Sequence, residues 1–151
     1  MSWRTILVPH DFSSSANHAA ALARDLALKF GARLVLLHVT EVPSGIGIDT
    51  AVVPSPGAAP ISLRDYANAN ANEHLADLAS RLEKDGVVVT TQVAVGRAVD
   101  EILRVAADEK ADLIAMGTHG RTGLRHLVTG SVTEKVVRTS PVPVLTVRVP
   151  D

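Results

Sequence analysis

Short apolar runs alternate with amphipathic segments along the chain, and this alternation constrains the fold more than any other feature of the sequence. The runs are rich in Val, Ile and Leu, which is typical of strands that are covered on both faces. Each run stops at Pro, Gly or a polar residue. Five strands are therefore predicted, at Thr5 to Pro9, Arg33 to Thr40, Val87 to Val95, Asp112 to Gly117 and Val142 to Val149.

Between the runs, apolar residues recur every three or four positions, which is the period of an amphipathic helix. The first such segment has Ser13 or Ser14 as a candidate N-cap and closes at Gly31. The apolar stripes run from Ala19 to Phe30, from Ala67 to Leu82 and from Val99 to Ala106, and a short fourth helix is predicted from Ser131 to about Thr139.

Strict alternation of strands and helices favours a parallel sheet with helices on both faces. The length of 151 residues suits one domain, 1–151. We predict a single-domain α/β, Rossmann-like fold whose five-stranded parallel sheet has the order 3-2-1-4-5. In such a sheet, ligands bind beyond the carboxyl ends of the first and fourth strands, where the winding reverses. Those ends are PHDFS, from Pro9 to Ser13, and GTHG, from Gly117 to Gly120.

Composition excludes several classes of protein. With 46% hydrophobic and 21% charged residues, the chain is not intrinsically disordered. The net charge of -1 provides no basic field for nucleic acid, and the absence of Cys excludes disulfides and thiolate metal sites. The apolar run before His10 is too short for a signal peptide or a membrane span. We expect a soluble, cytoplasmic protein.

One connection, from Glu41 to Ser62 and thus at about 41–63, departs from the short loops of such folds. It holds four of the eight prolines and three of the ten glycines. Connections of this length without regular structure are usually lids, binding loops or disordered linkers. We predict a flexible surface loop, with folding over a bound ligand as the alternative.

The stretch from Gly117 to Val132 is the densest in glycine, with the spacing G-x-x-G-x9-G-S. Gly117 and Gly120 would let the main chain leave the fourth strand tightly and pass close to a ligand. Gly130 precedes a helix, whose N-terminal N–H groups form a ready site for phosphate. Ser131 and Glu134 also spell a capping box, in which Ser131 would only cap the helix. Both interpretations of Ser131 stand.

Four sequence blocks together resemble the universal stress protein family over nearly the whole chain. They are ILVPHDFS at the first strand, VAVGRAVDEIL at the third strand and its helix, the G-x-x-G-x9-G-S spacing, and SPVPVLTV at the end. The glycine spacing is similar to that of the ATP-binding branch of the family. The resemblance therefore implies ATP as the ligand.

The resemblance also implies roles for individual residues. Phosphate or ribose contacts fall on Gly117, Gly120, Gly130 and Ser131, with Thr118 and His119 in the loop between. Asp11, preceded by Pro9, would contact adenosine, and main-chain groups at Val39 would recognise adenine. His10 stands where the family commonly has a small residue, and Gly96 is assigned to packing. Arg121 and Arg125 follow the loop and either neutralise phosphate or belong to a solvated face.

Six histidines show no spacing typical of a metal site, so no protein-built metal site is expected. Mg²⁺ held chiefly by the phosphates of ATP would need none. The chain has no Walker lysine and no carboxylate pair near the glycine-rich stretch. We therefore expect ATP binding with slow or no hydrolysis.

The last predicted strand carries Pro141 and Pro143 at its start, which places it at an edge of the sheet. The resemblance implies a homodimer joined antiparallel through Val142 to Val149, whereas a proline-guarded edge is the alternative. Three functions are considered: an ATP-binding protein of stress response or signalling, a dimeric interaction protein that binds no nucleotide, and a slow ATPase.

Overall fold

Five parallel strands form the central sheet of the computed structural model, which describes residues 2–118 and 130–149. Their order is β5-β2-β1-β6-β7, which is 3-2-1-4-5 when these five strands are counted along the chain. The predicted parallel sheet is therefore confirmed. The strands are β1 (Thr5–Pro9), β2 (Arg33–Thr40), β5 (Val89–Val95), β6 (Leu113–Gly117) and β7 (Val144–Val147).

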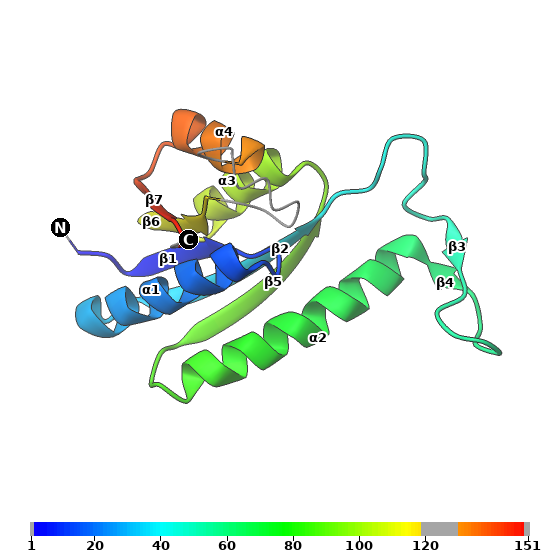
Figure 1. Ribbon diagram of the computed structural model, residues 1–151, viewed down its shortest axis with the longest axis horizontal. Coiled ribbons are helices and arrows are strands. Elements are labelled where there is room, and N and C mark those ends of the chain that lie inside the picture. Colours follow the sequence, from blue (N-terminus) through cyan, green and yellow to red (C-terminus); the bar gives the residue numbers. More distant parts are fainter. Residues whose placement is uncertain (1, 119–129, 150–151) are drawn as a thin grey trace.

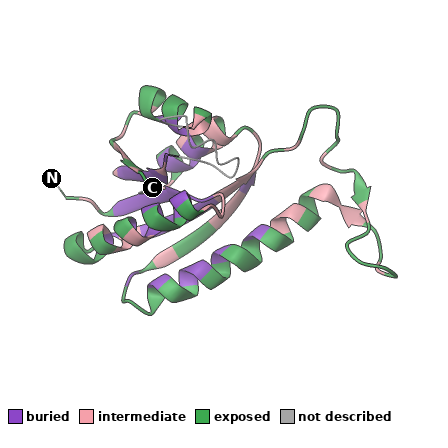
Figure 2. Cartoon of the chain, viewed as in Figure 1, coloured by how far each residue is buried: buried purple, intermediate pink, exposed green. Residues whose placement is uncertain are grey.

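Helices cover both faces of this sheet, as predicted (Figure 1). One layer holds α1 (Ser14–Phe30) and α2 (Leu63–Glu83), and the other holds α3 (Ala98–Asp108) and α4 (Ser131–Thr139). Side chains of β1 alternate between the two layers. Ile6 and Val8 belong to the core under α1 and α2, whereas Leu7 belongs to the core under α3 and α4. In Figure 2 the buried residues accordingly concentrate in β1 and the strands beside it.

The ends of α1 follow the predicted signals. The Ser13 side chain accepts a hydrogen bond from the Ala16 N–H at 3.1 Å, so Ser13 is the N-cap. Gly31 ends the helix in the left-handed conformation, with φ of +68°, and glycine adopts this conformation without a Cβ clash. Both ends of this helix are thus determined by local side-chain and backbone chemistry.

Three strands start later than predicted, and in two of them the first predicted residue makes other hydrogen bonds. The Asp112 carboxylate accepts hydrogen bonds from the N–H groups of Arg4 and Thr5, at 2.8 and 3.0 Å, and β6 starts only after it. The Val142 N–H donates to the Ser140 hydroxyl, which forms a turn ahead of β7. The strand β5 starts at Val89, after the exposed Val88.

The connection between β2 and α2, predicted as a flexible surface loop, contains a short element of regular structure. Ala51–Val52 (β3) and Ile61–Ser62 (β4) pair as a short antiparallel hairpin. The helix α2 begins at Leu63, ahead of the stripe that starts at Ala67, because the Ser62 hydroxyl accepts from the Asp65 N–H and caps it. Figure 1 shows the hairpin beside the N-terminal end of α2, projecting away from the sheet.

Among the described residues, no helix combines the length and apolar character that a membrane crossing requires.

Helix α1 lies against the carboxyl end of β6 at a point where only glycine fits. A Cβ atom built on Gly117 would lie 2.7 Å from the carbonyl carbon of Ser15 and 2.8 Å from its Cβ. Because one of these atoms belongs to the main chain of α1, a change of rotamer cannot relieve the clash.

Gly117→Ala should therefore lower the free energy of unfolding by about 1–3 kcal/mol, the usual cost of overpacking. Denaturant unfolding followed by circular dichroism measures it. Gly47→Ala is the matched control, because a Cβ there meets only Thr50 Oγ1 at 3.5 Å. A Gly117→Ala protein as stable as the control would show that α1 does not press on β6 as described.

Candidate functional site

A cavity of about 530 Å³ opens beyond the carboxyl ends of β1, β2 and β6. It lies where the winding of the sheet reverses, since β1 has β2 on one side and β6 on the other. The chain leaves β1 into α1 on one face and leaves β6 toward α4 on the other face. The structure thus places a cavity at the position predicted from the fold.

Six of the ten residues expected to hold a ligand line this cavity. They are Pro9, Asp11, Val39, Gly117, Gly130 and Ser131. Thr118 is buried and does not line the cavity, and its N–H donates to the Val147 carbonyl at 3.0 Å. The other three, His119, Gly120 and Arg121, lie outside the described residues, as does Arg125.

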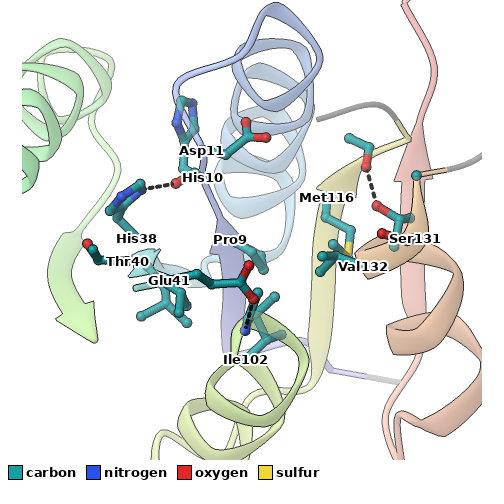
Figure 3. A pocket seen from close by; sticks show the side chains of 16 residues that line it. Pro9, His10, Asp11, His38, Thr40, Glu41, Ile102, Met116, Ser131 and Val132 are labelled. Carbon is teal, nitrogen blue, oxygen red and sulfur yellow. Dashed lines mark hydrogen bonds between the residues drawn. The ribbon is translucent and has the colours of Figure 1, made fainter. Parts of the chain in front are cut away.

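The N-terminal end of α4 faces the cavity, and Gly130 is its N-cap with φ of −65° and ψ of 155°. The Gly130 N–H donates to the Thr118 carbonyl, and the Thr133 hydroxyl donates to the Gly117 carbonyl at 2.8 Å. These two bonds hold the start of α4 against the end of β6. Figure 3 shows Ser131 and Val132 beside Met116 at this end of the cavity.

The capping-box interpretation of Ser131 is wrong. Ser131 is the first residue of α4 and not its N-cap, so its hydroxyl is not in the capping position. The Glu134 N–H donates to the Gly130 carbonyl, and no side chain in the described part of the chain caps this helix. The positive end of the helix dipole therefore points toward the cavity, with no side-chain acceptor on it among the described residues.

Gly117 lines the cavity, but its lack of a side chain is required by a different neighbour. The close approach at this position is to Ser15 of α1. Helix packing therefore explains this glycine, whether or not a ligand contacts it.

The turn between β1 and α1 carries Asp11 to the cavity. The Asp11 carboxylate accepts from the Ser13 N–H at 3.0 Å, and Asp11 remains partly exposed. Phe12, the next residue, has φ of +65°, a left-handed conformation that costs a non-glycine residue about 1–3 kcal/mol. The His10 ring accepts from the Phe12 N–H at 3.0 Å, so a hydrogen bond holds this strained turn.

Glu41 is a cavity residue that the sequence analysis did not identify. Its Oε1 atom accepts from the Ala98 N–H at 2.7 Å and so occupies the start of α3 (Figure 3). A signal was available, since Glu41 directly follows β2 and the carboxyl ends of parallel strands gather at one edge of the sheet. Ile102 had no such signal, because it belongs to the apolar stripe of a helix.

Polar and charged side chains are distributed unevenly around the cavity. Figure 3 shows His38, Thr40 and Glu41 on the β2 side and Ser131 on the α4 side. The acidic side chains are Asp11 and Glu41, and among the residues that the structure describes no Lys or Arg lines the cavity. In residues 2–118 and 130–149, no group of three His, Asp or Glu residues could hold a metal ion.

Comparison with known proteins assigns the family. A model of the universal stress protein family matches residues 2–148. The chain is 32% identical to universal stress protein MJ0531 of Methanocaldococcus jannaschii, over 98% of this chain and 84% of that protein. It is 35% identical to a universal stress protein of Thermus aquaticus, over 97% and 99% of the two chains. The solved structure of MJ0577 superposes with a TM-score of 0.83 at 28% identity, covering 100% of this chain and 99% of the other. The chain belongs to the universal stress protein family.

Proposed function

We propose that this protein binds ATP in the cavity, with the phosphates at the start of α4 and the adenosine toward β1 and β2. The observation that carries the proposal is the start of α4, where Gly130 and Ser131 line the cavity and no side chain of the described residues caps the helix. A helix N-terminus favours an anion, and glycine at the N-cap lets phosphate oxygens approach the main chain.

The remaining cavity residues suit adenosine. Val39, Ile102 and Met116 provide an apolar wall for a planar base, and the volume of about 530 Å³ lies within the usual range for ligand cavities. The carboxylates of Asp11 and Glu41 would accept hydrogen bonds from ribose hydroxyl or base amino groups, but would repel a triphosphate. This charge pattern supports one orientation of the nucleotide.

Proteins of the same fold support an adenine nucleotide as the ligand. A universal stress protein that superposes with a TM-score of 0.70 was solved in complex with cAMP, and one from Archaeoglobus fulgidus with a TM-score of 0.66 in complex with dAMP. They share 24% and 22% identity with this chain, so the likeness is one of fold. We infer a cytoplasmic role in stress response or signalling, in which bound ATP changes what the protein associates with.

Gly130→Ala should weaken ATP binding by about tenfold, or about 1.4 kcal/mol, measured by calorimetry. The φ and ψ values of Gly130 are open to alanine, so the methyl group adds bulk at the cavity without straining the main chain. Gly47→Ala, in the connection between β2 and α2, is the control and should bind ATP as the wild type does.

Wild-type affinity in Gly130→Ala would refute the phosphate assignment. A wild-type protein that binds no ATP would instead favour the dimeric interaction protein without nucleotide.

Hydrolysis of ATP with Mg²⁺ should be slower than about one turnover per minute. This is the range of nucleotide-hydrolysing proteins that act without an activating partner protein. Asp11 and Glu41 lie on the adenosine side of the proposed ligand, and the chain has no Walker lysine. A phosphate-release assay measures the rate, with Gly130→Ala as the background control. Faster turnover that falls with Gly130→Ala would identify the protein as an ATPase.

We also propose that two copies pair antiparallel through β7. This strand is at the edge of the sheet, where it pairs with β6 alone among the described residues. The N–H groups of Ile114 and Thr118 donate to the carbonyls of Pro143 and Val147. Since main-chain groups alternate sides along a strand, those of Val144 and Thr146 face the open edge.

Thr146→Pro should convert the dimer into a monomer, because proline removes an N–H that the second copy would use. Thr146→Ala keeps that N–H and is the control. Sedimentation velocity distinguishes the two states, and a Thr146→Pro dimer would exclude pairing through this edge.

A further inference from the structure

The left-handed turn at Phe12 depends on hydrogen bonds made by a buried histidine. His10 is only 4% exposed, and its Nδ1 atom accepts from the Phe12 N–H at 3.0 Å. Its Nε2 atom lies 3.0 Å from the Asn17 side-chain oxygen. An imidazole that accepts at Nδ1 and donates at Nε2 is neutral and in a single tautomer.

The main chain of His10 ties the same turn to β2. Its N–H donates to the Leu37 carbonyl at 2.7 Å, and its carbonyl accepts from the His38 Nδ1 at 2.8 Å (Figure 3). The Phe12 ring stacks on His38 with ring centres 4.6 Å apart and contacts His74 of α2 at 5.0 Å. The turn is therefore held on one side by aromatic packing and on the other by the His10 acceptor.

We propose that His10 is a positioning residue for the nucleotide site: its neutral imidazole holds the Phe12 turn that carries Asp11 to the cavity, and protonation of His10 releases it. A proton on Nδ1 would face the Phe12 N–H, so one hydrogen bond is lost and two donors oppose each other. Asp11 lies between these residues in the chain and moves with the turn. The inference rests on the proposed binding of ATP.

The surroundings of His10 favour the neutral form that the turn requires. Burial lowers the pKa of His10 from its ordinary value of 6.5, because a charged imidazole loses its hydration there. The hydrogen bond to Asn17 and the charge of Asp11 act in the opposite direction, while the charges of His38 and Arg81 lower the pKa further. The balance of these effects favours the neutral form of His10.

The direction of the pH effect follows from this lowered pKa. If ATP binds the protein with neutral His10, the affinity is highest at pH values well above the folded-state pKa and falls as the pH decreases through it. The apparent dissociation constant rises in inverse proportion to the neutral fraction, which is about tenfold at one pH unit below that pKa. The same proton lowers the stability of the fold over the same pH range.

The test compares the pH dependence of ATP binding in three proteins by calorimetry. His10→Asn places an amide oxygen where Nδ1 lies, so the acceptor stays but cannot be protonated. The control is His18→Asn on the exposed face of α1, where His18 contacts the Ser14 carbonyl and does not line the cavity. Because ATP itself titrates in this range, only the difference between the proteins is interpreted.

As the pH decreases, we expect the ATP affinity of wild type and of His18→Asn to fall more steeply than that of His10→Asn. The midpoint of that loss should equal the His10 pKa measured from its imidazole NMR signals. Equal pH profiles in all three proteins would overturn the inference and leave the proposed function intact. Absence of ATP binding at pH 8 in wild type would overturn both.

A second measurement uses wild type alone, in case His10→Asn does not fold. Binding that requires neutral His10 must lower the His10 pKa further, so saturating ATP should shift its NMR titration to lower pH. An unchanged or raised His10 pKa in the presence of ATP would refute the role assigned to this residue.

Discussion

Burial of β1 on both faces is the constraint on which the rest of the structure depends. Ile6, Leu7 and Val8 are all fully buried, and they divide between the two helical layers. A parallel sheet buried in this way must be covered on both faces, and its crossovers must change direction beside the central strand. The segments that follow β1 and β6 then lead to opposite faces of the sheet, and the cavity opens between them. The site is a consequence of how the core is covered.

The cavity relies on main-chain geometry at one end and on side chains at the other. At the α4 end, the bonds from Gly130 to Thr118 and from Thr133 to Gly117 fix the helix start against β6. At the β2 end, Glu41 is held by the first turn of α3. A site with a helix N-terminus at one end and a carboxylate at the other can orient a molecule that has an anionic end and a hydrogen-bond-donating end. Such an arrangement supports the binding of a molecule of this kind.

Strain and hydrogen bonding are combined in the turn that borders this site. Phe12 adopts a conformation that a bulky side chain normally avoids, and it persists because ring packing and the His10 acceptor both favour it. A buried neutral histidine is sensitive to pH, whereas a hydroxyl or aliphatic side chain at the same place would not be. The identity of residue 10 therefore bears on how the turn responds to its surroundings, although the fold does not require a histidine there.

Local patterns in the sequence determined the strands of the main sheet, the positions of its helices, and the cap residues Ser13 and Gly31, because each depends on residues close in the chain. Together with the family resemblance, they also indicated six of the residues that line the cavity. Tertiary structure decided what depends on residues far apart. Glu41 meets the start of α3 from 57 positions away, and Gly117 is glycine because Ser15 of α1 presses on it. The bonds that tie the His10 main chain to Leu37 and His38 of β2 likewise follow from how the chain packs, since a local pattern cannot record which distant atoms will lie beside it.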